Sequence, residues 1–329
     1  MTPSRLSLGL GLAALFALFA ALLLGSAPLS VADVFQALAG SGPAATDTII
    51  WQIRLPRALA AFVVGAGLGL AGAALQGLLR NPLADPGVLG VSAVASLCAS
   101  TALYFGLVAL SAWVLPLAAI AGALLATTLL AFAALRTPSV VSLLLVGVGV
   151  WSCAGALMAL LLNMAPNPFS LADLINWMLG TVANRSLQDL ALAVPFAAVG
   201  AAILWCQRAA LSALTLGEDA AHGVGVDVPR LRALVVLGTG LVTGATVSLA
   251  GAVGFVGLLA PHAVRPFVGH DPGRSLFPSA VLGGVIVVLA DILVRLAPTD
   301  SELKLGVVAA LIGAPAFVAI AVQRQGIHG

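Results

Sequence analysis

The chain has 329 residues, of which 61% are hydrophobic and only 8% are charged, and its formal net charge is +2. An ordinary soluble domain carries roughly a quarter charged residues, so this composition excludes such a domain and indicates a chain surrounded by lipid. Membrane β-barrels need short strands of alternating polarity, and no such alternation is present. We therefore predict an all-α polytopic membrane protein. The small net charge says little about partners, and we expect no nucleic acid among them.

Ten apolar segments are predicted to cross the membrane as helices, which need about 20 residues each. The first resembles a signal peptide, because Arg5 precedes an apolar run, but Leu6–Leu24 is longer than a signal core of roughly 7 to 15 residues. We interpret it as a span. In chain order the predicted spans are 8–27, 58–79, 88–107, 113–135, 140–162, 189–206, 231–250, 251–264, 276–297 and 305–322.

One boundary decides the number of spans. Residues 233–260 form a single apolar run, which hydropathy alone would make one tilted helix, and only a division at Gly251 gives ten spans rather than nine. Basic residues favour the cytoplasmic side. With ten spans and both termini in the cytoplasm, nine basic residues face inward and five face outward; with nine spans the split is eight to six. The inward set is Arg5, Arg80, Arg136, Arg208, Arg230, Arg232, Arg265, Arg274 and Arg324, and the outward set is Arg54, Arg57, Arg185, Arg295 and Lys304.

Arg54 and Arg57 lie at the outer end of the second predicted span, against this charge bias, in the sequence IRLPRALAAF. Pro56 suits the first turn of a helix, so it fixes where the arginines begin. Arg295 reaches the same side of the membrane. Arginine stems often cover apolar surface while the guanidinium reaches the lipid headgroups. A guanidinium also offers a planar fork that fits a carboxylate, so a role in binding acidic groups is the second interpretation.

The second predicted span carries Gly65, Gly67, Gly69 and Gly72, and such small residues let helix backbones approach closely. Asn81, Pro82 and Leu83 follow at its cytoplasmic end. The residue before a proline avoids the helical conformation, so Asn81-Pro82 and Asp85-Pro86 should stop the helix. This stretch is either a simple turn between two spans or a cytoplasmic gate.

The chain offers no energy source of its own. A phosphate loop needs a lysine followed by Ser or Thr, but the single lysine, Lys304, precedes Leu305. Ion-coupled transport usually uses ionisable residues inside the spans; Asp291 is one, but Arg295 stands at i+4, where the two can pair. We expect no catalytic residue and no metal site, since Cys98, Cys153 and Cys206 are scattered through apolar segments.

The longest predicted intracellular loop, 207–232, has the sequence QRAALSALTLGEDAAHGVGVDVPRLR. Thr215 could cap a short helix with Glu218 and Asp219 in its first turn, where the helix dipole favours anions. Gly223 or Gly225 would end this helix. Such an element is either a docking helix or a loop that needs a cap.

Four stretches together resemble the FecCD family of permeases of type II ABC importers, which take up vitamin B12, haem and ferric siderophores. They are RLPRALAAFVVGAGLGLAGAALQGLLRNPLADPGVLGVS (54–92), LGEDAAHGVGV (216–226), GAVGFVGLLAPHAVRPFVGHDPGRSLFPSAVLGGVIVVLADILVR (251–295) and LGVVAALIGAPAFVAI (305–320). The resemblance implies one transmembrane permease domain, residues 1–329, with ten spans in the bacterial inner membrane. It also implies a homodimer, two ATPase subunits that use ATP and Mg, and an extracytoplasmic binding protein.

The resemblance also implies roles for particular residues. Arg54, Arg57 and Arg295 would receive glutamates from the two lobes of the binding protein. The coupling loop to the ATPase would comprise Thr215, Leu216, Gly217, Glu218, Asp219, Ala220, Ala221 and Gly225. The chain departs from the family where a proline usually precedes the glycine that opens the last span, because Lys304 and Leu305 stand there instead.

For the substrate, family frequency favours a ferric siderophore, with haem and cobalamin as close alternatives. Two readings of another class stay open, an ion-coupled secondary transporter and a structural or channel subunit. The scarcity of buried carboxylates argues against the first, and the predicted coupling loop argues against the second. This chain itself is expected to bind no cofactor and to hydrolyse no ATP.

Overall fold

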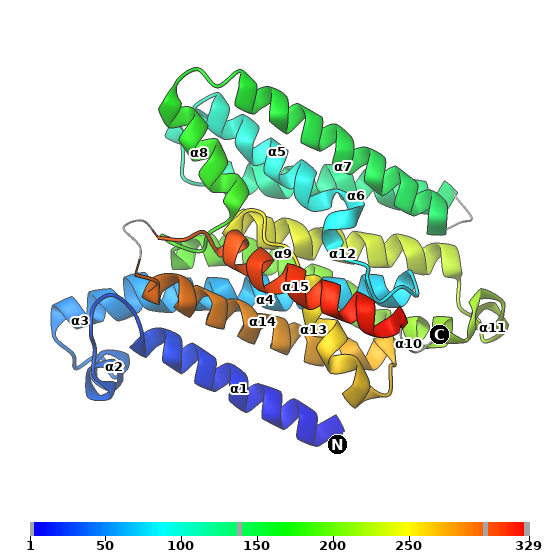
Figure 1. Ribbon diagram of the computed structural model, residues 1–329, viewed down its shortest axis with the longest axis horizontal. Coiled ribbons are helices and arrows are strands. Elements are labelled where there is room, and N and C mark those ends of the chain that lie inside the picture. The colour runs from blue at the N-terminus through cyan, green and yellow to red at the C-terminus, as the bar shows by residue number, and fades with distance from the viewer. Residues whose placement is uncertain (1–2, 137–139, 299–301, 326–329) are drawn as a thin grey trace.

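The computed structural model describes residues 3–136, 140–298 and 302–325, and these residues form helices and loops without a strand (Figure 1). The extreme ends of the predicted permease domain, 1–2 and 326–329, lie outside the described residues. Ten helices correspond to the ten predicted spans. They are α1 (Pro3–Leu23), α4 (Leu55–Leu78), α5 (Val91–Tyr104), α6 (Val114–Arg136), α7 (Val140–Asn163), α9 (Leu187–Cys206), α12 (Val228–Ala250), α13 (Val256–Val264), α14 (Pro272–Leu296) and α15 (Leu305–Gln325).

Within the described residues, seven helices are long and apolar enough to cross a membrane. The all-α membrane fold is therefore confirmed. The helix α13 has 9 residues, so it covers only about 14 Å at 1.5 Å per residue. The start of α1 and the end of α15 lie at the same end of the bundle as α11 (Glu218–Gly223), opposite α2 (Val31–Leu38) and α3 (Ala44–Thr48) (Figure 1). This arrangement agrees with two termini on one side of the membrane.

Gly251 separates α12 from α13, which confirms the division into ten helices. Its φ of 68° lies in the left-handed region that favours glycine, and an added Cβ would overlap the carbonyl oxygen of Trp177. The backbone then runs without helix to Phe255, which also has a positive φ of 66°. Non-helical backbone at this depth is tolerated where other protein segments surround it, and here the end of α8 (Pro168–Leu179) covers Gly251.

The helix α4 lies at the centre of the bundle and contacts α12, α13 and α14. Its glycines face different neighbours. An added Cβ at Gly65 would overlap the carbonyl of Gly283 in α14, and one at Gly72 would overlap the carbonyl of Gly257 in α13. Small residues let these backbones touch, so the predicted close approach is confirmed.

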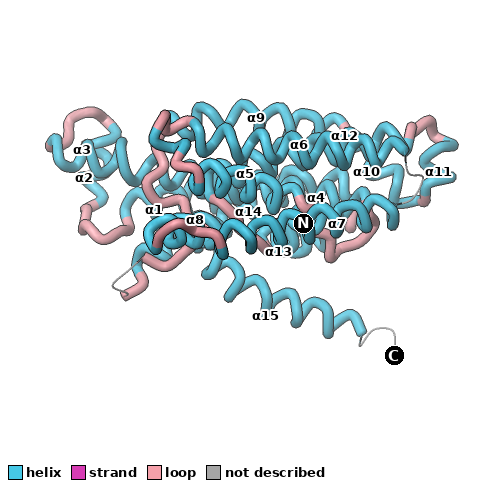
Figure 2. Tube along the Cα trace, turned by 90° about the horizontal axis from the view of Figure 1, so that it is seen from above, coloured by secondary structure: helices cyan, strands magenta, loops and turns pink. Residues whose placement is uncertain are grey.

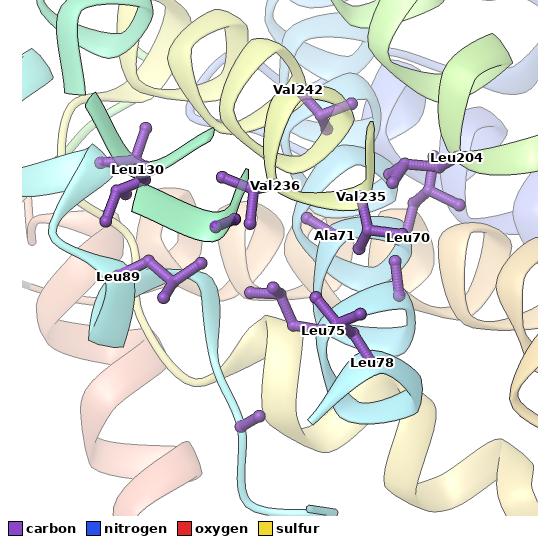
Figure 3. Close-up of a cluster of buried hydrophobic side chains, with 14 of the residues drawn as sticks. Leu70, Ala71, Leu75, Leu78, Leu89, Leu130, Leu204, Val235, Val236 and Val242 are labelled. Atoms are coloured by element: carbon purple, nitrogen blue, oxygen red, sulfur yellow. The ribbon is translucent and has the colours of Figure 1, made fainter. Parts of the chain in front are cut away.

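Buried aliphatic side chains fill the space between α4, α6, α9 and α12 (Figure 3). Leu75, Leu130 and Leu204 have no exposed surface.

The last helix, α15, lies at the side of the bundle. It contacts α8, α13 and α14, and seen from above it runs outward from the other helices (Figure 2).

Short helices complete the described chain, and sequence analysis did not predict those in the outer segments. The capping side chains explain two of them: Ser30 and Asp33 form a capping box at α2, and the Asn167 side chain accepts from the Ser170 N–H at α8. The remaining short elements are the π-helix η1 (Ile49–Arg54), α10 (Arg208–Ala213), and the 3₁₀ turns η2 (Pro86–Leu89), η3 (Leu107–Ala109), η4 (Leu214–Leu216) and η5 (Arg265–Val268).

Candidate functional site

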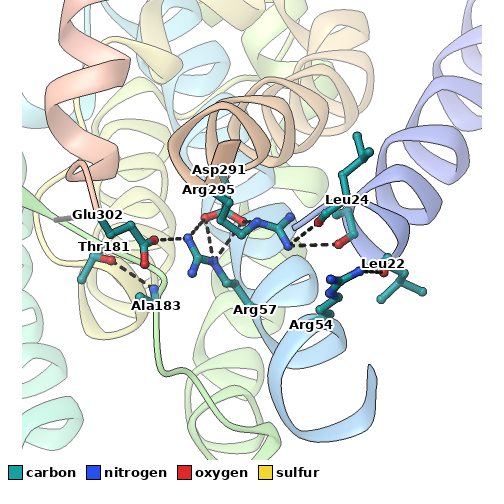
Figure 4. Close-up of polar contacts among 10 residues, drawn as sticks. Leu22, Leu24, Arg54, Arg57, Thr181, Ala183, Asp291, Arg295 and Glu302 are labelled. Atoms are coloured by element: carbon teal, nitrogen blue, oxygen red, sulfur yellow. Dashed lines mark hydrogen bonds and ion pairs between the residues drawn. The ribbon is translucent and has the colours of Figure 1, made fainter. Parts of the chain in front are cut away.

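A cluster of charged side chains lies at the outer end of the bundle, where α4 begins and α14 ends (Figure 4). Arg57 of α4 donates to Asp291 of α14 through Nε, at 2.9 and 3.1 Å, and through Nη2, at 2.8 Å. The same Nη2 donates to the Glu302 carboxylate, which precedes α15. Asp291 is buried, whereas 39% of the Glu302 side chain is exposed. One guanidinium therefore joins three segments that lie far apart in the sequence.

Arg295 belongs to the same cluster. Its Nε lies 3.1 Å from Asp291 Oδ2, which confirms the predicted i,i+4 pair. Its Nη1 also donates to the carbonyls of Ala21 and Leu24, each at 3.1 Å. The buried carboxylate of Asp291 is thus shared by two arginines, and Arg295 also fastens α14 to the end of α1.

Arg54 also binds the end of α1, through backbone carbonyls. Its Nη1 donates to the carbonyls of Leu22 and Leu23 at 2.7 and 2.8 Å, and its Nη2 donates to the carbonyl of Ala27. The last carbonyls of a helix lack partners within the helix and carry partial negative charge. Arg54 and Arg295 supply these partners, so they cap α1.

These arginines lie within the packed outer end of the bundle and not on its open surface. Arg54 is 4% exposed and Arg57 is 8% exposed, because carbonyls and carboxylates of the same chain already hold their guanidinium groups. For the same reason their guanidinium groups bind protein atoms rather than lipid headgroups. Docking of a binding protein involves a second chain and stays a prediction. Sequence analysis missed Glu302, whose only signal was an acidic residue near the outer end of a span.

The predicted coupling loop, 207–232, folds as α10, η4 and α11 at the cytoplasmic end. Glu218 and Asp219 lie in the first turn of α11, as predicted, but Thr215 does not cap this helix. Its hydroxyl donates to the carbonyl of Ser212 at 2.7 Å, and Gly217 takes the cap position with a φ of 106°. Gly225 follows the helix with a positive φ.

An ion pair ties α11 to the body of the protein. Arg232 of α12, which is buried, donates to Glu218 at 2.7 Å. Leu216 and Val224 flank the helix and are 76% and 70% exposed, whereas Ala221 is fully buried. The loop thus exposes two apolar side chains at the cytoplasmic side, and the ion pair of Glu218 with Arg232 holds the loop against α12.

The stretch after α4 forms a tight turn, as one of the two interpretations predicted. The Asn81 side chain accepts from the Leu83 N–H at 2.9 Å, and the Asp85 side chain accepts from the Gly87 N–H at 2.8 Å. Burial raises the pKa of the Asp85 carboxyl, although the hydrogen bond from Gly87 acts in the opposite direction. A role of Asn81, Pro82 and Leu83 as a gate stays a prediction.

Two apolar cavities adjoin this turn. One, of about 620 Å³, is lined by Leu83, Asp85, Trp151 and Phe255 among others. The other, of about 340 Å³, lies between α5, α7 and α8, and Trp151 lines it too. The non-helical segment between α12 and α13 contributes Phe255 to the first and Ala252 to the second. A wall of this kind suits a bulky ligand with much apolar surface.

Comparison with known proteins identifies the family. The sequence pattern of the FecCD transport family matches residues 13–323. The chain belongs to the FecCD transport family. Like its family, this FecCD protein is an ABC-transporter permease of the inner membrane. It is 41% identical over 275 residues, 83% of both chains, to the vitamin B12 import system permease protein BtuC of Salmonella paratyphi A, and equally to that of Salmonella typhi.

The fold of this FecCD permease also matches a solved structure. A metal-chelate type ABC transporter in an inward-facing conformation is 29% identical, with a TM-score of 0.88, over 97% of this chain and 99% of that one.

Lys304 and Leu305, which stand where the family usually has a proline, leave the last helix intact. In this FecCD chain α15 begins at Leu305, and the Lys304 carbonyl accepts from the N–H groups of Val307 and Val308 at 3.1 and 3.2 Å.

Proposed function

We propose that the chain is the membrane-spanning subunit through which an ABC importer moves cobalamin into the cytoplasm. The observation that carries the substrate is the 41% identity, over 83% of both chains, to permeases named for vitamin B12 import. Because of this identity, we favour cobalamin over the ferric siderophore, which family frequency had favoured. A ferric siderophore is the second candidate, because the structural neighbour is a metal-chelate type transporter.

The proposed route runs along the apolar cavities that Trp151 lines, between α5, α7 and the break before α13. Cobalamin is large, so one chain's cavities of about 340 and 620 Å³ are only part of the path. We propose that two copies of the chain face each other across it. The turn at Asn81, Pro82 and Leu83 would close the route at its cytoplasmic end, and Leu83, which lines the larger cavity, supports this role.

The energy would come from partner chains. An ABC permease works with ATPase subunits and a binding protein, and we propose two ATPase subunits that use ATP and Mg, with no cofactor on this chain. The loop from Thr215 to Gly225 would dock in the ATPase through Leu216 and Val224. The fixed base at Glu218 and Arg232, 2.7 Å apart, supports transmission of movement to α12.

The binding protein would dock at the outer end. We propose that its carboxylates reach Arg57 by replacing Glu302, the half-exposed partner in the cluster. Asp291 is buried and would stay in place, so it would keep Arg57 and Arg295 oriented. Arg54 would act indirectly in this scheme, because its guanidinium caps α1. Such charged contacts steer association and weaken as salt increases.

Uptake in a bacterial strain that lacks its own vitamin B12 permease tests the substrate. The chain is expressed there with its own ATPase and binding protein, and accumulation of labelled cobalamin and of a labelled ferric siderophore is compared. The proposal expects cobalamin accumulation that excess unlabelled cobalamin abolishes. Accumulation of the ferric siderophore alone would assign the permease to the second candidate.

A further inference from the structure

A groove at the cytoplasmic end includes the start of the predicted coupling loop but none of the residues that we propose dock in the ATPase. It lies beside α14, between the first turns of α1 and the junction of α9 with α10, and its volume is about 810 Å³. Six of its lining residues divide into two kinds. Arg208 and Arg274 are basic, whereas Leu6, Trp205, Phe267 and Phe277 are apolar.

The basic side chains retain donors for an anion. The Arg208 guanidinium lies 4.8 Å from the centre of the Trp205 ring, and its Nη1 is 3.3 Å from the Trp205 carbonyl. Arg274 is 72% exposed, with Nε 3.4 Å from Asp271. A guanidinium has five N–H donors, so these contacts use only part of the capacity.

Among the described lining residues, Asp271 is the one carboxylate of the groove, and it already accepts several hydrogen bonds. Asp271 Oδ1 accepts from the Ser212 hydroxyl at 2.5 Å and from the N–H groups of Gly273 and Arg274 at 2.9 and 3.2 Å. Asp271 therefore caps α14, where the helix dipole offsets its negative charge. The two arginines leave the groove with a net positive charge.

The apolar lining faces outward, as a lipid-contacting surface does. Trp205, Phe267 and Phe277 are 45%, 50% and 49% exposed. Tryptophan side chains such as Trp205 gather at the boundary between membrane and water, and the two exposed phenylalanines extend this apolar surface. Beyond the groove, α1 continues with the exposed side chains Leu8 and Leu12. An acyl chain could therefore leave the groove along a surface that is already apolar.

We propose that this groove binds one anionic phospholipid of the cytoplasmic leaflet. Arg208 and Arg274 hold its phosphate, and Trp205, Phe267 and Phe277 contact its glycerol and upper acyl chains. Basic pockets between helices on the cytoplasmic side suit acidic headgroups. A free phosphate ion would use the arginines but not the aromatic side chains, so the lining favours a lipid over a soluble anion.

Trp205 provides a local probe for the test. A variant in which Trp51, Trp113, Trp151 and Trp177 are changed to Phe keeps Trp205 as the single tryptophan. It is placed in mixed micelles with brominated phosphatidylglycerol or brominated phosphatidylcholine, whose acyl chains quench a tryptophan in contact with them. We expect half-maximal quenching by the anionic lipid at a mole fraction roughly tenfold lower, since each arginine near the membrane surface favours it.

Two double variants separate the groove from general charge attraction. Arg208→Gln with Arg274→Gln should reduce the preference between the two lipids to about one. Arg136→Gln with Arg230→Gln removes two exposed cytoplasmic arginines outside the groove and should leave the preference unchanged. Equal quenching by the two lipids, or an unchanged preference without Arg208 and Arg274, would overturn the proposal. So would displacement of the lipid by inorganic phosphate at unchanged ionic strength.

A second measurement needs no tryptophan substitution, so it tests the proposal even if the single-tryptophan variant does not fold. Native mass spectrometry of the otherwise unaltered chain counts the phosphatidylglycerol molecules that remain after delipidation. We expect one tightly held molecule in the chain and in the Arg136/Arg230 control, and none in the Arg208/Arg274 variant. Retention of the molecule by all three proteins would contradict the proposed site.

Discussion

Arg57 and Asp291 form a buried ion pair across the outer end of the bundle, with Nε at 2.9 Å and Nη2 at 2.8 Å from the same carboxylate oxygen. The pair joins α4 to α14, the two helices whose glycines also touch near Gly65 and Gly283. Arg295 shares the carboxylate at 3.1 Å. One buried acidic side chain thus holds two arginines at the outer end of the bundle.

Asp291→Asn should destabilise the fold. The change leaves two guanidinium charges without their shared buried carboxylate, and removal of one partner from a buried pair typically costs about 3–5 kcal/mol. Unfolding in a denaturing detergent measures the free energy of unfolding. Asp173→Asn, at an exposed position of α8, is the matched control and should change it little. An unaltered unfolding curve for Asp291→Asn would contradict the structural role of the pair.

Glu302→Gln should strengthen binding-protein docking. The change removes the half-exposed competitor for Arg57 and leaves Asp291 in place, so affinity should increase about twofold to fivefold, the range of an exposed ion pair. Affinity is measured at low and high salt, again with Asp173→Asn as control. Equal or weaker binding would argue against docking at Arg57. A double variant, Arg54→Glu with Arg57→Glu, would be a less sharp test, because it also removes the Arg54 cap of α1 and the buried pair of Arg57 with Asp291.

Sequence reasoning was most successful for the spans. Long apolar runs predicted most of the spans, because membrane thickness is a local constraint on helix length. The division at Gly251 depended on the family resemblance, since hydropathy alone allowed nine spans or ten. Sequence reasoning failed for α2 and α8, which are too short to show in hydropathy. The charged cluster was predicted only in part. The pair of Asp291 with Arg295 follows from i,i+4 spacing, whereas Arg57 and Glu302 meet across 245 residues, and only the packing of α4, α14 and α15 brings them together.

Leu216→Asp should uncouple ATP hydrolysis from transport. Leu216 is 76% exposed beside α11, so a charge there should disturb docking in the ATPase without a cavity or clash in the bundle. We expect uptake to fall roughly tenfold, as for a contact at the centre of an interface. Ala221, another residue of the predicted coupling loop, is a poor probe because it is buried and a large side chain there would disrupt the loop itself.

The control for this coupling test is Leu110→Asp. Leu110 is 79% exposed and lies directly after η3, away from the coupling loop. Uptake and substrate-stimulated ATPase activity are measured in liposomes, and the elution profile reports folding. Normal uptake by Leu216→Asp would exclude this side chain from coupling.

Gly72→Ala should prevent correct assembly of α4 against α13. The added Cβ would overlap the carbonyl of Gly257, and overpacking of this kind commonly costs about 1–3 kcal/mol. Gly9→Ala in α1 is the control, because nothing lies within 4 Å of a Cβ there. The fraction of chain recovered as a single species in detergent should fall for Gly72→Ala alone. Equal recovery of both variants would show that α4 and α13 pack less closely.

Reconstitution of the complete importer tests the function most directly. The permease, its ATPase subunits and its binding protein are assembled in liposomes. ATP and Mg are supplied on the side of the membrane where the ATPase subunits lie, and entry of labelled cobalamin is followed. We predict accumulation that requires all three components and stops when ATP is replaced by a non-hydrolysable analogue. Uptake by the permease alone, driven by a proton or sodium gradient without ATP, would contradict its assignment as the permease of an ABC importer.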